Sequence, residues 1–142
     1  MLSFDSHSPA ETERFAEELA SKLKGGDVLA FKGGLGAGKT TFVRGLARGL
    51  GSQSEVSSPT FALVHEYSCT PPLYHFDMYR IHTFDDLYST GFFDYLDSGG
   101  ILAVEWSENI DGALPPETIT VTITPAGEEQ RRIAVEGGAG RF

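Results

Sequence analysis

The feature that most constrains this chain is a glycine-rich octapeptide that lies between an apolar run and an amphipathic segment. Its residues, Gly33 to Thr40, match the pattern Gly-x-x-x-x-Gly-Lys-Thr at every fixed position. The apolar run Val28–Lys32 has the length of a buried strand, and apolar residues recur at helical spacing from residue 39 to about residue 50. A strand, a glycine turn and a helix in this order predict an α/β fold with the turn at a strand's carboxyl end.

This octapeptide has the chemistry of a phosphate cradle. Glycines let the backbone approach an anion closely, successive N–H groups form a nest, and the following helix directs its positive end at the same point. Lys39 would reach the outer phosphates, and the Thr40 hydroxyl would bind Mg²⁺. We therefore predict that the chain binds ATP with Mg²⁺. The predicted nucleotide-binding residues here are Gly33, Gly36, Ala37, Gly38, Lys39, Thr40 and Thr41.

The remaining pattern predicts one α/β domain over residues 1–142, with a mixed central sheet flanked by helices. Ser8 is a predicted N-cap, with Pro9 at the first helical position and Glu11 completing a capping box. Gly91 should interrupt a helical segment over residues 83–96, and the tail from residue 137 to 142 should fray. Further strands are predicted at residues 61–67, 73–78 and 101–106, and a terminal hairpin at residues 119–124 and 131–135.

Two carboxylates are candidate catalytic residues. Glu105 ends the apolar run that starts at Ile101, where a carboxylate could hold a magnesium-bound water or orient the attacking one. Asp77 is the second candidate, and alternation places it on the same strand face as His75. Arg80 could meet phosphate or a partner, but a simple surface pair between Asp77 and Arg80 is an equally good interpretation.

Two further residues belong to this hypothesis. Thr60 could sense the γ-phosphate as residues of switch loops do, although the sequence around Pro59 by itself favours an ordinary proline turn. Trp106 is the chain's single tryptophan and directly follows Glu105. Alternation predicts that its ring points to the sheet face opposite the Glu105 carboxylate, close enough to the site to sense nucleotide binding.

Composition narrows the possible partners. The formal net charge of −9 disfavours a strong direct grip on nucleic acid, and it suits either simple solubility or a basic partner protein. The single cysteine, Cys69, excludes an intrachain disulfide and fits a reducing compartment. We see no signal peptide and no apolar stretch of membrane-spanning length, so we expect a cytoplasmic protein that does not enter a membrane.

Four segments together resemble the TsaE family, also called YjeE. They are residues 35–41, 58–61, 75–80 and 104–108, within a resemblance that covers about residues 8–135. The first segment is shared with many nucleoside triphosphatases (NTPases), whereas the last three together are specific to this family. The chain departs from the family pattern at Gly34, where Asp is usual, and at Ser107, where Pro is usual.

The resemblance implies a P-loop ATPase that is weak alone and acts with the TsaD and TsaB proteins to make threonylcarbamoyladenosine in tRNA. It implies that Thr40 and Glu105 hold magnesium and that Asp77 supports catalysis. It also implies that Thr60 lies in a switch-like loop, and that Thr12 and Arg132 lie near the nucleotide.

The alternative functions are a small-molecule or nucleotide kinase and a nucleotide-binding module that does not hydrolyse ATP. A kinase usually has a lid with arginines that close on the phosphates. Only Arg44, Arg48 and Arg80 lie between the octapeptide and Glu105, which favours the ATPase. Glu105 and Asp77 argue against a module without hydrolysis.

Overall fold

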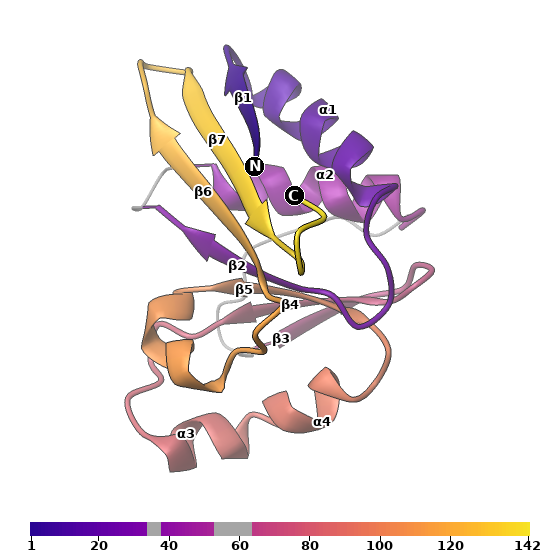
Figure 1. The fold of residues 1–142 in the computed structure, drawn as a ribbon, viewed down its shortest axis with the longest axis vertical. Helices are drawn as coiled ribbons and strands as arrows, with labels where there is room; N and C mark the ends of the chain where they lie inside the picture. The colour runs from indigo at the N-terminus through magenta and orange to yellow at the C-terminus, as the bar shows by residue number, and fades with distance from the viewer. Residues whose placement is uncertain (34–37, 53–63) are drawn as a thin grey trace.

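In the computed structural model, the described residues are 1–33, 38–52 and 64–142, and they form one seven-stranded sheet with helices on both faces (Figure 1). The helices are α1 (Pro9–Ala20), α2 (Lys39–Gly49), α3 (Phe84–Ser89), α4 (Phe92–Leu96) and the 3₁₀ segment η1 (Ser107–Ala113). The strands are β1 (Leu2–Ser6), β2 (Val28–Lys32), β3 (Val64–Tyr67), β4 (Leu73–Asp77), β5 (Ile101–Glu105), β6 (Ile119–Pro125) and β7 (Arg131–Gly137). No helix in these ranges is long and apolar enough to cross a membrane.

The sheet is mixed, as the sequence predicts. Its strand order is β1-β7-β6-β2-β5-β4-β3. The four central strands β6, β2, β5 and β4 are mutually parallel, while β7, β1 and β3 pair antiparallel at the two sides. The predicted terminal hairpin is present as β6 and β7. Because β2, β5 and β4 run in one direction, their carboxyl ends meet at a single edge of the sheet.

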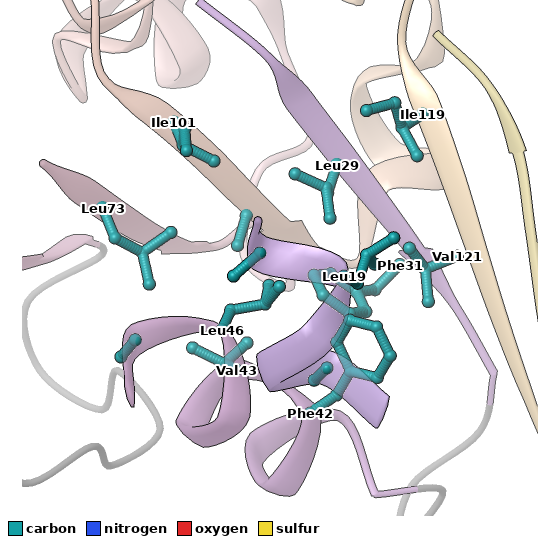
Figure 2. Close-up of a cluster of buried hydrophobic side chains, with 14 of the residues drawn as sticks. Leu19, Leu29, Phe31, Phe42, Val43, Leu46, Leu73, Ile101, Ile119 and Val121 are labelled. Atoms are coloured by element: carbon teal, nitrogen blue, oxygen red, sulfur yellow. The ribbon is translucent and has the colours of Figure 1, made fainter. Parts of the chain in front are cut away.

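Side-chain alternation divides the core between the two faces of the sheet. One face packs Leu29 and Phe31 of β2 against α1 and α2 (Figure 2), while Val28 and Leu102 belong to the cluster that α3, α4 and η1 complete. In Figure 1, α1 and α2 lie on one side of the sheet and α3 and α4 on the other. α1 and α2 approach so closely that a Cβ on Gly45 would lie 2.2 Å from the Glu13 carbonyl oxygen, which explains the glycine.

The structure adds one element to the predicted set and corrects the end of another. Residues 2–6 form β1, an edge strand beside β7 that the sequence analysis missed although Leu2 and Phe4 alternate toward the core. β5 ends at Glu105 because Trp106 adopts left-handed backbone angles (φ 58°, ψ 40°) that turn the chain out of the sheet. In the tail, which the sequence predicts to fray, the Arg141 guanidinium pairs with the Asp27 carboxylate and Phe142 packs against the core.

Other boundaries agree with the sequence. Gly91 separates α3 from α4 with φ 81°, as predicted. The Ser8 hydroxyl caps α1 by accepting a hydrogen bond from the Glu11 N–H. The capping box differs in one bond, because the Glu11 carboxylate accepts from the His7 N–H rather than from that of Ser8.

Candidate functional site

The two candidate carboxylates lie side by side at the carboxyl edge of the sheet. Asp77 ends β4 and Glu105 ends β5, and the parallel register makes them direct neighbours. Asp77 lies an even number of residues after Leu73, and Glu105 an even number after Ile101, so alternation puts each on the same sheet face as that residue. Leu73 and Ile101 belong to the core cluster under α2. The carboxylates are therefore on the sheet face that α2 covers, beside the end of β2, where Lys32 leads into the octapeptide.

The N-terminus of α2 lies at the same edge. Gly38 occupies the N-cap position with φ 99° and has no side chain with which to cap the helix. The Nζ atom of Lys39 lies 5.3 Å from the centre of the Trp106 ring, just past the end of β5. A Cβ on Gly38 would be 4.0 Å from Nε of Arg131, at the start of β7. The start of α2 thus lies between the ends of β5 and of the β6–β7 hairpin.

Glu105 has a buried histidine as its partner. His75 is fully buried, and its Nε2 lies 2.5 Å from Oε2 of Glu105, whose side chain is 13% exposed. An ionised carboxylate only accepts hydrogen bonds, so Nε2 is the donor. Nδ1 of His75 is buried and has no hydrogen-bond partner among the described residues. The sequence analysis gave His75 no role, although its alternation with Asp77 was the signal that placed it on this face.

Asp77 is not engaged with Arg80. The Oδ1 atom of Asp77 accepts a hydrogen bond of 2.9 Å from the Tyr79 N–H. Both Asp77 and Arg80 lie in the part of the chain that the structure describes, and no ion pair joins them there. The interpretation of these two residues as a simple surface pair is therefore wrong for this structure, and the Asp77 side chain stays at the carboxyl edge.

Trp106 follows the alternation rule and still contacts the site. Its ring packs with the cluster on the face opposite Glu105, as predicted, and lies 4.9 Å from the Tyr79 ring. A left-handed conformation is unusual for a bulky residue, and here it sets the ring beneath the Lys39 ammonium. The next residue, Ser107, donates its hydroxyl hydrogen to the Phe31 carbonyl at 3.2 Å. Ser107 therefore ties η1 to β2.

A hollow of about 260 Å³ lies beside the start of β7. Asp5, Ser6, His7, Ala126, Gln130, Arg131 and Arg132 line it. Of the two residues predicted near the nucleotide, Arg132 lines this hollow and pairs through Nε with Asp5 at 3.1 Å. Thr12 is buried behind it and donates its hydroxyl hydrogen to Ser6 Oγ at 2.7 Å. Arg131, which the sequence analysis did not select, is the arginine beside Gly38.

The remaining predicted residues divide into two groups. Gly33 follows β2 and is exposed, and Thr40 and Thr41 lie half-buried in the first turn of α2. Gly36, Ala37 and Thr60 lie outside the residues that the structure describes.

The donors at the edge fit magnesium rather than a transition metal. Thr40 would offer a hydroxyl oxygen, and Glu105 and Asp77 offer carboxylate oxygens, the ligand type that Mg²⁺ prefers. Residues 1–33, 38–52 and 64–142 contain no group of three or more His, Cys, Asp or Glu side chains able to hold a metal.

Known proteins resemble the chain over most of its length. The family described as "Threonylcarbamoyl adenosine biosynthesis protein TsaE" matches residues 6–133. The tRNA threonylcarbamoyladenosine biosynthesis protein TsaE of Bacillus subtilis is 40% identical over 136 residues, which cover 95% of this chain and 85% of the relative. The protein of the same name from Treponema pallidum is 37% identical, covering 92% of this chain and 96% of the relative.

A solved structure agrees with the sequence comparisons. The crystal structure of Bacillus subtilis YdiB aligns with a TM-score of 0.78 and 36% identity, covering 97% of this chain and 86% of that one. This neighbour has the P-loop fold, so the predicted fold class is confirmed. On the extent and identity of these matches, the chain belongs to the TsaE family.

Proposed function

We propose that this chain is an ATPase subunit that acts in the cytoplasm with the TsaD and TsaB proteins to make threonylcarbamoyladenosine in tRNA. One observation carries the ATPase part. The start of α2, with Lys39, lies at the same edge of the sheet as Asp77 and Glu105, and His75 is hydrogen-bonded to Glu105. The names of the relatives from Bacillus subtilis and Treponema pallidum support the assignment to tRNA threonylcarbamoyladenosine biosynthesis.

Each proposed site residue has a role that follows from its position at the edge of the sheet. The octapeptide and the first turn of α2 bind the phosphates, and Lys39 leaves its place over the Trp106 ring to neutralise the outer ones. Magnesium, held by the Thr40 hydroxyl and by Glu105 directly or through water, would neutralise charge on the phosphates. Asp77 helps to order the attacking water. His75 holds one oxygen of Glu105 and so sets the direction of the carboxylate.

The hollow beside β7 is the place that we propose for the nucleoside. Arg131 stands between it and Gly38, and Arg132 and Ser6 line it. Thr12 acts here through its hydrogen bond to Ser6. Thr60, in the segment between α2 and β3, would respond to the γ-phosphate.

The kinase alternative has little support among the described residues. Arg48 pairs with Glu13 of α1 and therefore serves helix packing, and Arg80 is exposed after β4. A partner protein that supplies an arginine finger would raise the rate of such an ATPase by about 10³–10⁵.

The decisive experiment measures ATP hydrolysis by the purified chain with and without purified TsaD and TsaB. We expect slow hydrolysis by the chain alone and a changed rate in the presence of both partners. Phosphate transfer to a nucleotide or metabolite acceptor would support the kinase instead. Tight ATP binding with no hydrolysis under any of these conditions would support a module that only binds nucleotide.

A further inference from the structure

The face of the molecule formed by α3, α4 and η1 carries exposed aromatic side chains. Phe84 and Tyr88, one helical turn apart on α3, are each 67% exposed. Their ring centres are 6.3 Å apart, and the Phe93 ring of α4 lies 5.8 Å from Phe84 and 6.5 Å from Tyr88. Clustered exposed rings are costly in water and commonly mark interaction sites.

A hollow of about 410 Å³ opens beside these rings. Its apolar lining includes Phe84, Leu87 and Phe93 from α3 and α4, and Ile110 from η1. α3 is held rigidly by a complete capping box between Thr83 and Asp86. The rings and the hollow are therefore organised in advance, which lowers the entropy cost of binding a partner.

Acidic side chains outnumber basic ones around the hollow, although Lys32 of β2 pairs with Asp111 of η1 at 3.8 Å. The sequence contains no Lys or Arg from residue 81 to residue 130. Exposed acidic side chains occur on all three bordering elements, with Asp85 on α3, Asp94 on α4 and Glu108 on η1. Such a surface repels nucleic acid, anionic lipid and a second copy of itself, and it attracts a basic protein surface.

The hollow is also connected to the nucleotide edge. Ile81, a few residues after Asp77, and Ile110, a few residues after Glu105, both line it. Asn109 lines it too and donates from Nδ2 to the Met78 carbonyl at 2.8 Å, which fastens η1 to the end of β4. An occupant of the hollow would therefore press on the segments that directly continue from both carboxylates.

We infer that this face, which we call the α3–α4 surface (Phe84, Tyr88, Phe93, Asp85 and the adjoining hollow), docks a protein partner. The partner presents an apolar side chain that fills the hollow, within a rim of Lys and Arg residues. Its docking changes the rate of ATP hydrolysis through the segments that follow Asp77 and Glu105. The identity of the partner, and the effect on hydrolysis, rest on the proposed function.

The test uses the purified TsaD–TsaB complex as the probe and measures its affinity for the full chain and its effect on hydrolysis. The double variant Phe84→Ala/Tyr88→Ala should bind about tenfold or more weakly, lose the effect of the partners, and keep the hydrolysis rate of the isolated chain. Asp85→Lys should weaken binding as well. Glu18→Lys, the same charge change on the exposed side of α1, should not. Thermal melting of each variant checks that the fold is intact.

The outcomes separate this inference from the proposed function. If the parent chain binds the complex and both the double variant and Asp85→Lys bind equally well, the α3–α4 surface is not the docking site, while the proposed function stands. If the parent chain does not bind the complex, the proposed partners are wrong and the inference falls with them. Dimerisation of the parent chain that the double variant loses would assign the surface to a second copy instead.

Discussion

The helices of this protein begin in two different ways. The N-termini of α1 and α3 are capped by side chains, since Ser8 caps the first and Thr83 and Asp86 form a complete capping box on the second. α2 begins at Gly38, which has no side chain to contribute. Hydrogen bonding by the His82 N–H, and then by Thr83, lowers the pKa of the Asp86 carboxyl below its ordinary value.

The difference between α2 and these two helices matches their proposed roles. An uncapped glycine start alone does not mark a site, because α4 also begins at a glycine, Gly91, without a side-chain cap. An N-terminus leaves backbone N–H groups that require acceptors, and α1 and α3 supply acceptors from their own chain segments. α2 instead brings its start to the edge where Glu105 and Asp77 lie, and places a lysine there. The same physical requirement is met locally in α1 and α3, whereas in α2 it suits an external anion.

The strongest test of this contrast is Lys39→Ala. We expect ATP affinity to fall by about tenfold or more, because hydrogen bonds to charged groups contribute about 1.5–3 kcal/mol. Thermal melting without nucleotide should change little, since the Nζ atom contacts the Trp106 ring rather than an ion partner. Calorimetric titration with ATP and Mg²⁺ measures the effect, and Lys24→Ala, at the opposite edge of the sheet, is the matched control. Unchanged affinity would refute the assignment of the α2 start to phosphate.

Glu105→Gln should separate binding from turnover. The amide keeps the size of the side chain but loses the negative charge, so hydrolysis should fall on the order of 10²-fold while ATP affinity stays near that of the parent. Single-turnover assays with the partners present give the rate. Glu18→Gln, the same change at an exposed position of α1, should be neutral. If Glu105→Gln retains the parent rate, Asp77 becomes the better candidate for the catalytic role.

His75→Leu tests whether the buried histidine positions Glu105. The substitution removes the Nε2 donor while filling similar space, and we expect kcat to fall about tenfold with ATP affinity largely kept. His75→Gln, whose amide nitrogen can replace the Nε2 donor, should restore part of the lost rate. An equal loss of kcat in both variants, with an equal drop in melting temperature, would mean that His75 is only a core residue.

Thr83→Ala should lower stability and leave ATP affinity unchanged. Loss of the cap on α3 should lower the free energy of unfolding by about 1 kcal/mol, which chemical denaturation can measure. ATP affinity should remain unchanged, because α3 lies on the sheet face opposite α2. A clear loss of ATP affinity would contradict the view that the start of α3 has no role in nucleotide binding.

The smallest expected effect is spectroscopic. Trp106 is the only tryptophan, and the Lys39 ammonium lies over its ring. Phosphates that draw this ammonium away should shift the emission saturably when ATP or ADP is added with Mg²⁺. Lys39→Ala should show no such shift. A flat fluorescence titration, with binding established by calorimetry, would mean that Lys39 keeps its position when nucleotide binds.

Local patterns in the sequence determined most of the elements and part of the site. The octapeptide, the helix after it, the cap at Ser8 and the break at Gly91 depend on hydrogen bonds and backbone preferences within a few residues. Such features are readable from short stretches. The same reasoning located Lys39, Asp77 and Glu105, because each lies at the end or start of a strongly patterned element.

The tertiary structure decided the contacts between distant segments. The parallel register of β4 and β5 sets His75 against Glu105, although they are 30 residues apart in the chain. Pairing of β1 with β7 also brings Ser6 into the hollow beside Arg131. Periodicity indicates the face on which a side chain lies, but which strands become neighbours depends on burying the whole core. For this reason the sequence predicted Glu105 as a candidate, and only the fold revealed the histidine that orients it.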